Sequence, residues 1–308
     1  MEKLEGQRIL VTGPAGQIAF PLAARLARDN EVWGIARFSL AGSRERVEAA
    51  GIHARQLDLA DPKWSELPED FDYILHLAAF IGPGHDYDRA LRVNAEGSGK
   101  LMSRFRRARA CLLMSSCAVY ASPPDGEYAV VESDPLGGSP QSYAPTYCVS
   151  KIAQEAVARF AAQEYGLPTT LARMNVAYGD NGGLPGMLFE AILADQPIPV
   201  QPGRASLCSP IHEEDIFAHT PGLLAGASLT ATATNWGGDE PVEIKELCTT
   251  MARLVGRDAR FVESPEGIHH YLLDPARRRE LGGPCRVQWR EGIRRMIAAR
   301  HPELTLAK

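Results

Sequence analysis

The feature that most constrains this chain is a glycine-containing turn near its start, set between an apolar run and a helical pattern. Residues 8–12 (RILVT) predict a buried strand, and residues 21–28 predict a helix. Between them, Gly13 permits a tight turn, Gly16 allows close approach of the backbone, and Ala19 leaves room for helix–strand packing. This arrangement predicts a dinucleotide-binding turn with a pyrophosphate at the helix N-terminus. The alternative is a structural turn without a ligand.

The order of the predicted elements favours the α/β class, with a doubly wound parallel Rossmann sheet and a smaller C-terminal substrate-binding lobe. The predicted strands cover residues 8–12, 31–36, 54–57, 73–77, 110–114 and 169–174. The predicted helices of the first half cover residues 21–28, 43–50, 87–108 and 146–165. Those that follow cover residues 186–195, 213–225, 243–255 and 287–300. We expect an NAD(P)-binding domain over residues 1–178 that also receives residues 206–238, and a second lobe from residues 179–205 and 239–308.

A stretch rich in Pro, Gly and Ser covers residues 121–142. It is too long for a simple connector, so we expect it to fold over a site.

Composition and charge exclude several kinds of partner. The 308-residue chain has a formal net charge of −5, which argues against nucleic-acid and anionic-membrane partners. Its apolar runs are too short to cross a bilayer, and residues 1–8 do not resemble a signal peptide. Six cysteines lie far apart without a CxxC pair, which argues against a disulfide framework. The adjacent His269 and His270 have no third residue at metal-ligand spacing, which argues against a metal site there. We therefore expect a cytoplasmic protein with reduced thiols and no bound metal.

The end of the second predicted strand distinguishes NADP from NAD. In NAD sites an Asp or Glu at this place bonds the ribose hydroxyls and repels a 2′-phosphate. Here Ala36 stands at the acidic place, Arg37 follows with a guanidinium that matches phosphate geometry, and Ser39 adds a hydroxyl. NADP is preferred, although a merely solvated Arg37 would fit the same sequence. Asp58, after the third strand, is placed to meet the adenine amino group.

A second group of residues predicts acid–base chemistry. Tyr147 and Lys151 are four residues apart at the start of a predicted helix, so their side chains share one face. A phenol in water has a pKa near ~10, and a neighbouring ammonium stabilises the phenolate. Tyr147 is therefore expected to act as a general acid or base. Ser116, which follows the strand ending at Met114, completes the group.

With these residues the chain resembles the extended short-chain dehydrogenase/reductase family, including its NAD-dependent epimerase/dehydratase branch. The glycine motif matches at Gly13, Gly16 and Ala19. The other matching segments are residues 76–79 (HLAA), 93–98 (VNAEGS), 115–120 (SSCAVY), 210–215 (PIHEED), 235–238 (NWGG) and 274–282 (DPARRRELG). The resemblance runs almost from end to end, and its motifs say little about the substrate.

The resemblance implies roles for individual residues. Ser116 would hydrogen-bond the substrate oxygen, Tyr147 would transfer the proton, and Lys151 would hold the nicotinamide ribose and tune Tyr147. The expected cofactor-binding residues are Gly13, Ala15, Gly16, Gln17, Ile18, Arg37, Asp58, Leu59, Leu77, Ala78, Ala79, Asn94, Tyr147 and Lys151. A homodimer is also implied, with an interface built from the long helices before Ser116 and after Tyr147.

Three departures from the family pattern limit the reactions and substrates that we expect. Residues 117–118 (Cys-Ala) replace the Asp-Glu pair of dehydratases, so dehydration is not expected. Where nucleotide-sugar enzymes carry an Asn, this chain has Val176, with Asn175 displaced by one residue. Where they carry an Arg that grips the diphosphate, it has Cys208, although Arg204 lies nearby. A small, non-nucleotide substrate is favoured, and a nucleotide sugar is not excluded.

Three functions follow from these residues. The leading hypothesis is an NAD(P)-dependent oxidoreductase, preferring NADP, that acts on the carbonyl or alcohol of a small-molecule substrate. The first alternative is a (nucleotide-)sugar epimerase with tightly bound NAD. The second is a non-catalytic regulator that senses NADP, although such a sensor has no need of Tyr147.

Overall fold

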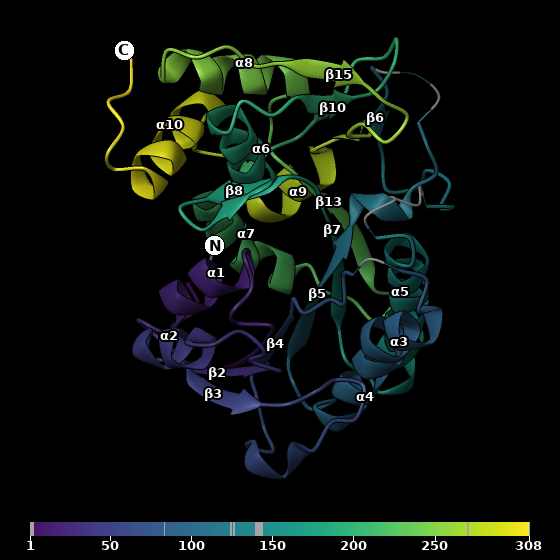
Figure 1. The fold of residues 1–308 in the computed structure, drawn as a ribbon. Coiled ribbons are helices and arrows are strands. Elements are labelled where there is room, and N and C mark those ends of the chain that lie inside the picture. The colour runs from purple at the N-terminus through teal and green to yellow at the C-terminus, as the bar shows by residue number, and fades with distance from the viewer. Residues whose placement is uncertain are drawn as a thin grey trace.

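A seven-stranded parallel sheet forms the centre of the computed structural model, which describes residues 3–82, 84–123, 125, 127–138, 144–269 and 271–307. The strand order is β13-β7-β5-β4-β1-β2-β3, and every neighbouring pair is parallel. The strands are β1 (Arg8–Thr12), β2 (Glu31–Ala36), β3 (His53–Gln56), β4 (Tyr73–His76), β5 (Ala110–Ser116), β7 (Thr169–Met174) and β13 (Thr232–Trp236). The predicted doubly wound α/β fold is confirmed (Figure 1).

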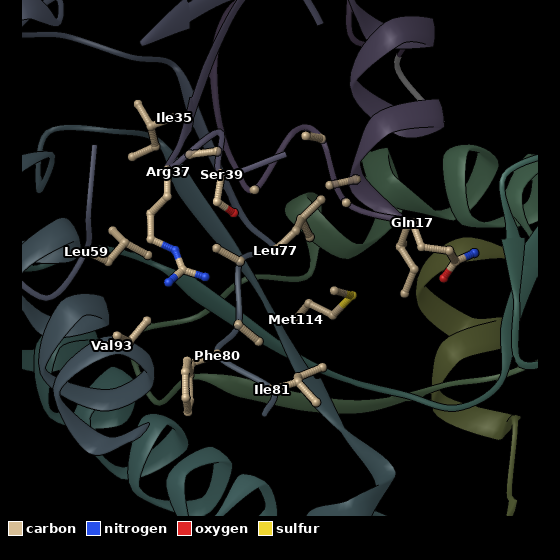
Figure 2. A pocket seen from close by; sticks show the side chains of 18 of the residues that line it. Gln17, Ile35, Arg37, Ser39, Leu59, Leu77, Phe80, Ile81, Val93 and Met114 are labelled. Atoms are coloured by element: carbon tan, nitrogen blue, oxygen red, sulfur yellow. The ribbon is translucent and has the colours of Figure 1, made fainter. Parts of the chain in front are cut away.

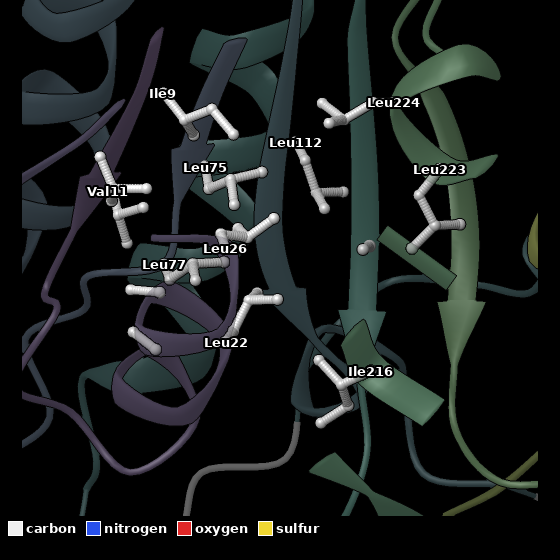
Figure 3. Packing of buried hydrophobic residues seen from close by; sticks show 14 of the residues in the cluster. Ile9, Val11, Leu22, Leu26, Leu75, Leu77, Leu112, Ile216, Leu223 and Leu224 are labelled. Carbon is white, nitrogen blue, oxygen red and sulfur yellow. The ribbon is translucent and has the colours of Figure 1, made fainter. Parts of the chain in front are cut away.

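Helices cover both faces of this sheet, because its strands are apolar on both sides. Their bounds are α1 (Ala19–Leu26), α2 (Ser43–Ala49), α3 (Tyr87–Leu91), α4 (Gly97–Arg104), α5 (Tyr147–Glu164), α6 (Leu184–Leu193), α7 (Glu213–Ala225), α8 (Ile244–Leu254), α9 (Ala276–Gly282) and α10 (Trp289–Arg300). On one face Leu22 of α1 and Leu223 of α7 pack with Ile9 and Leu112 (Figure 3). On the other face, α4 and α5 enclose a second apolar cluster that includes Leu101.

A smaller group of elements lies above the sheet in Figure 1. α6, α8 and α10 share an apolar core of their own, which includes Phe189, Leu247 and Ile293. Its short strands are β8 (Ala177–Gly179), β9 (Gly182–Gly183), β10 (Ile198–Val200), β11 (Leu207–Cys208), β12 (Ile211–His212), β14 (Val242–Glu243) and β15 (Phe261–Glu263). They pair as β12-β8-β9, β10-β15 and β11-β14. The two lobes bounded near residues 178, 205 and 238 stay a prediction.

The helix predicted over residues 87–108 has a different form. A π-helical turn over Arg92–Glu96 separates α3 from α4, and α4 ends at Arg104. The helix stops there because Phe105 turns inward and packs edge-on against Trp64 and Phe71. The segment is therefore shorter than predicted and widened in its middle.

The stretch over residues 121–142 contains a strand that the sequence did not predict. β6 (Ala129–Val130) pairs with β16 (Leu272–Leu273), which ties this stretch to the C-terminal part of the chain. Residues 124, 126 and 139–143, like His270, lie outside the described residues. Among the described residues, no helix combines the length and apolar character needed to cross a bilayer.

Candidate active site

The glycine turn between β1 and α1 leaves the start of the helix open to a ligand. Gly13 has a φ of +70°, and a Cβ there would lie 3.1 Å from the Cα of Ala78, so the turn favours glycine. The N–H of Gly13 donates to the carbonyl of Ile35, and the N–H of Gly16 to that of Gly13, both at 2.8 Å. No side chain of the described part caps α1 at Ile18, so no side chain competes with an anion for the start of the helix.

A cavity of about 500 Å³ runs from this turn along the carboxyl ends of the strands. The predicted cofactor-binding residues that line it are Gly13, Ala15, Gly16, Gln17, Ile18, Arg37, Asp58, Leu59, Leu77, Ala78, Ala79, Tyr147 and Lys151. Figure 2 shows Arg37 extending from the end of β2 into the cavity toward Leu59 and Val93. An open helix start beside a long, mostly apolar wall fits a dinucleotide.

Asn94 is the exception among the predicted cofactor-binding residues. Its side chain is 1% exposed and lies behind the wall, outside the set of described residues that line the cavity. Its Oδ1 accepts from the N–H of Phe80 at 2.6 Å, and its Nδ2 donates to the Phe80 carbonyl at 3.0 Å and to Oγ of Ser150 at 2.9 Å. Asn94 thus fixes the segment around Phe80 to the first turn of α5, and its contact with the cofactor stays a prediction.

The three predicted catalytic side chains meet where the cavity reaches the end of β5. Ser116, Tyr147 and Lys151 all line the cavity. Lys151 follows Tyr147 by one turn of α5, with its Nζ 5.9 Å from the centre of the phenol ring. Ser116 ends β5, and its Oγ accepts a hydrogen bond from the N–H of Ala118 at 3.2 Å. A phenol, a hydroxyl and an amine so grouped can exchange a proton with a substrate oxygen.

Lys151 is buried, and both of its hydrogen-bond partners are uncharged. Its Nζ donates to the carbonyl of Met114 at 2.6 Å and to Oε1 of Gln154. Burial lowers the pKa of Lys151 to about 7, although Glu155 opposes this shift. The ammonium therefore releases its proton more readily than that of a solvated lysine.

A buried polar chain behind Lys151 was missed by the sequence analysis. Nε2 of Gln154 donates to Oγ of Ser98 at 2.8 Å, and this hydroxyl lies 2.7 Å from Nε2 of His76. The other ring nitrogen of His76 lies 2.8 Å from Oγ1 of Thr12. Burial, and to a smaller degree Lys151, lowers the pKa of His76 to about 3, so the imidazole is neutral. The spacing of Gln154 from Lys151 on one helix face was the clue available in the sequence.

A second cavity, of about 730 Å³, adjoins the first. Both cavities are lined by Gln17, Ile18, Ser116, Tyr147, Met174 and Asn175. Much of the remaining wall is apolar and includes Val176, Leu184, Met187 and Ile268. A molecule in the second cavity would therefore meet the end of the first cavity at the Tyr147 phenol.

The second cavity carries little net positive charge. Among its described lining residues, Arg300 of α10 is the one arginine or lysine, and its Nη2 donates to Glu190 at 3.0 Å. Cys208, which stands where nucleotide-sugar enzymes carry the arginine that grips the diphosphate, lines the cavity. Its thiol donates to the carbonyl of Val242 at 3.4 Å. Arg204, the nearby substitute, is not among these lining residues. Sequence analysis missed Arg300 because it follows the last matching segment.

Asn175 is held by the backbone around it. Its Nδ2 donates to the carbonyl of Tyr271 at 2.7 Å, and its Oδ1 accepts from the N–H groups of Val176 at 2.7 Å and Ser209 at 3.1 Å. The amide thus fixes three segments at the wall that both cavities share.

Known proteins resemble this chain along most of its length. A putative GDP-L-fucose synthase 2 of Oryza sativa subsp. japonica is 27% identical over 251 residues, which cover 74% of this chain and 71% of that protein. A dTDP-4-dehydro-6-deoxy-D-allose reductase of Streptomyces bikiniensis is 26% identical over 314 residues, which cover 93% of this chain and 89% of that protein. The chain spans about half the length, 46%, of a trifunctional UDP-glucose 4,6-dehydratase of Arabidopsis thaliana that it also matches.

Solved structures share the fold. A UDP-N-acetylglucosamine 4-epimerase from Methanobrevibacter ruminantium M1 superposes with a TM-score of 0.84 at 19% identity, over 97% of this chain and 100% of that one. The model of the NAD dependent epimerase/dehydratase family matches residues 9–201, which is more than half of the chain. The chain therefore belongs to the NAD-dependent epimerase/dehydratase family, within the extended short-chain dehydrogenases/reductases, and is an enzyme of that NAD(P)-dependent oxidoreductase type.

Proposed function

We propose that this protein transfers hydride between NADP(H) and the alcohol or carbonyl group of a small, non-nucleotide substrate. The observation that carries the proposal is the junction of the two cavities, where Ser116 and Tyr147 line both. A dinucleotide in the first cavity and a substrate in the second would then be in contact beside a proton donor.

Each side chain at the junction has a separate task. A bound nicotinamide supplies or accepts the hydride. Ser116 donates a hydrogen bond to the substrate oxygen, and Tyr147 gives or takes the proton at that oxygen. Lys151, held against the Met114 carbonyl, would hold the ribose hydroxyls of the cofactor, and its protonated form would stabilise the phenolate.

The preference for NADP rests on the end of β2. Ala36 leaves the adenosine ribose without the carboxylate that would repel a 2′-phosphate. Arg37, Ser39 and Ser43 all line the cavity there, and they offer a guanidinium and two hydroxyl donors. Asp58 lines the same end, where it would accept a hydrogen bond from the adenine amino group.

The preference for a small, uncharged substrate rests on the second cavity. A nucleotide diphosphate carries two or more negative charges and needs cations that are free to grip it. Arg300 already pairs with Glu190, and Glu266 adds another carboxylate to the same wall. A substrate with an apolar body and a single reacting oxygen suits this lining better.

The decisive test is the variant Tyr147→Phe. Removal of the phenol hydroxyl is expected to lower kcat by about 100-fold or more with NADPH and a panel of small carbonyl compounds. The melting temperature should stay close to that of the unmodified protein. Tyr165→Phe, at the C-terminal end of the same helix, is the matched control and should retain activity. Near-normal turnover of Tyr147→Phe would contradict the proposal that Tyr147 transfers the proton.

A sugar epimerase with tightly bound NAD is the second candidate, and the solved epimerase structures with the same fold favour it. The two candidates differ in how they hold the dinucleotide. An epimerase that returns hydride to its own substrate retains NAD(H) through gel filtration, whereas a reductase exchanges NADP(H) with solvent. Absorbance and mass spectrometry of the denatured, purified protein distinguish them.

Two further expectations belong to this proposal. A homodimer is supported by α5, where Val149, Ala156 and Phe160 are exposed on one helical face. A cytoplasmic location is supported by the cysteines, each of which is a free thiol.

A further inference from the structure

A buried group of three potential metal ligands lies outside both cavities. Asp215 and His219 occupy one face of α7, four residues apart, and Cys285 follows the end of α9. Their carboxylate, imidazole and thiol ligand atoms all lie within 4.8 Å of one another. Asp215 is 1% exposed and His219 is fully buried.

The buried imidazole of His219 has few polar partners, the Pro284 carbonyl being the one that acts on it most directly. Neither of its ring nitrogens reaches hydrogen-bond geometry with any described residue, although the ring lies near the Pro284 carbonyl. A buried polar group without a partner costs about 1 to 3 kcal/mol, so such groups are rare in native folds. The tight contact with Gly282, where an added Cβ would lie 2.9 Å from that of His219, keeps the imidazole in place.

The other two side chains are fixed by the backbone. The two carboxylate oxygens of Asp215 accept hydrogen bonds from the N–H groups of Arg286 at 2.7 Å and Val287 at 3.2 Å. The N–H of Cys285 donates to Asp239 at 2.9 Å. Each Asp215 oxygen keeps a second lone pair, and hydrogen bonds of this kind commonly orient carboxylates that bind metals.

The charges and the open space around the group decide how a cation would reach it. Two arginines, Arg278 and Arg286, act on His219 by their charge, and Arg278 is paired with Asp239, which acts in the opposite direction. A small cavity of about 50 Å³ is lined by Cys285, Asp239 and Glu240, and its volume is enough for one or more waters. The cavity thus leaves space for water beside Cys285, with two acidic residues in its wall.

From this geometry we infer a zinc site formed by Asp215, His219 and Cys285, with a water from the small cavity as the fourth ligand. A mixed oxygen, nitrogen and sulfur set suits Zn²⁺, and atoms that lie within 4.8 Å of one another need only draw together slightly to surround the ion. On binding, the thiol gives its proton to solvent, so the aspartate and the thiolate balance the charge of the ion. The metal would clamp α7 to the segment that leads into α10, at a distance from the proposed chemistry.

Cobalt binding to the full-length, EDTA-treated protein tests this inference. Co²⁺ is expected to bind in one equivalent and to produce a thiolate-to-cobalt charge-transfer absorption, which Zn²⁺ then abolishes by competition. Cys285→Ala should lose this absorption and bind Zn²⁺ at least about 100-fold more weakly, because the sulfur ligand is gone. Cys248→Ala, which removes a buried thiol elsewhere, should keep both properties.

His219→Gln provides a second, independent variant. This variant should keep the thiolate-to-cobalt absorption at high Co²⁺ concentration but bind Zn²⁺ more weakly. Zn²⁺ should also raise the melting temperature of the unmodified protein more than that of either ligand variant. Absence of the charge-transfer absorption in the unmodified protein, or its persistence in Cys285→Ala, would overturn the site. Neither result would bear on the Tyr147 mechanism.

Discussion

At the scale of single residues, Arg37 is expected to set the choice of dinucleotide. Arg37→Ala removes charge-assisted hydrogen bonds to a 2′-phosphate, which are worth about 1.5 to 3 kcal/mol. We expect kcat/KM for NADPH to fall by about 10- to 100-fold, with a change below about threefold for NADH. Arg44→Ala, on exposed α2, is the control. An equal loss with both dinucleotides would show that Arg37 does not recognise the phosphate.

Asn94 is expected to act by fixing the segment around Phe80. Asn94→Ala breaks the hydrogen bonds to both backbone groups of Phe80 and to Ser150, so the wall of the first cavity loosens. The Kd of the dinucleotide should rise by about 10-fold while kcat at saturation changes little. Calorimetric titration and steady-state kinetics measure the two effects separately. A fall in kcat with an unchanged Kd would instead indicate a role in the chemistry.

The sequence identified site residues wherever local spacing carries the chemistry. Tyr147 and Lys151 are one helical turn apart, and the glycine turn is contiguous, so both could be predicted. Gln154, Ser98 and His76 come from three elements and meet only because α4 and α5 pack on the same side of β4. Such meetings depend on tertiary packing, which no local pattern encodes.

At the scale of elements, α5 is expected to form the centre of the dimer interface. Phe160 is 61% exposed and Val149 is 42% exposed on one face of this helix. Phe160→Glu places a charge in that face, and desolvating an unpaired carboxylate costs several kcal/mol, so the protein should elute as a monomer. Light scattering after gel filtration measures the mass. Val262→Glu, on exposed β15, should leave the mass unchanged, and a monomeric unmodified protein would contradict the proposal.

Element prediction succeeded where apolar periodicity was strong and failed where packing overrides it. The bounds of α7 and β7 coincide with the residues predicted from the pattern. The π-helical turn over Arg92–Glu96 accompanies the insertion of Asn94 against Phe80, a contact between distant segments. β6 has two residues and exists only because β16 lies beside it. Neither feature has a local signature of its own.

At the scale of the whole molecule, the buried imidazole of His76 is expected to make the fold sensitive to acid. Burial lowers its pKa in the folded state to about 3, from 6.5. The unfolded chain therefore binds a proton as the pH falls below about 6.5, while the folded chain does not until about pH 3. Stability from this group is complete above pH 6.5 and is lost as the pH falls toward 3. Between pH 7 and 4.5 the loss is about 2 to 3 kcal/mol.

Chemical denaturation across this pH range measures the contribution of His76 to the pH dependence of stability. The comparison needs a neutral residue at position 76 that does not titrate but keeps the polar contacts. His76→Gln offers an amide to Ser98 and Thr12, which hold the imidazole in the unmodified protein. Its unfolding free energy should depend less steeply on pH between 6.5 and 4.5, by about 1.4 kcal/mol per pH unit. His53→Gln, on exposed β3, should keep the original slope. Equal slopes in all three proteins would mean that other groups cause the acid sensitivity and that His76 is not buried as the sheet requires.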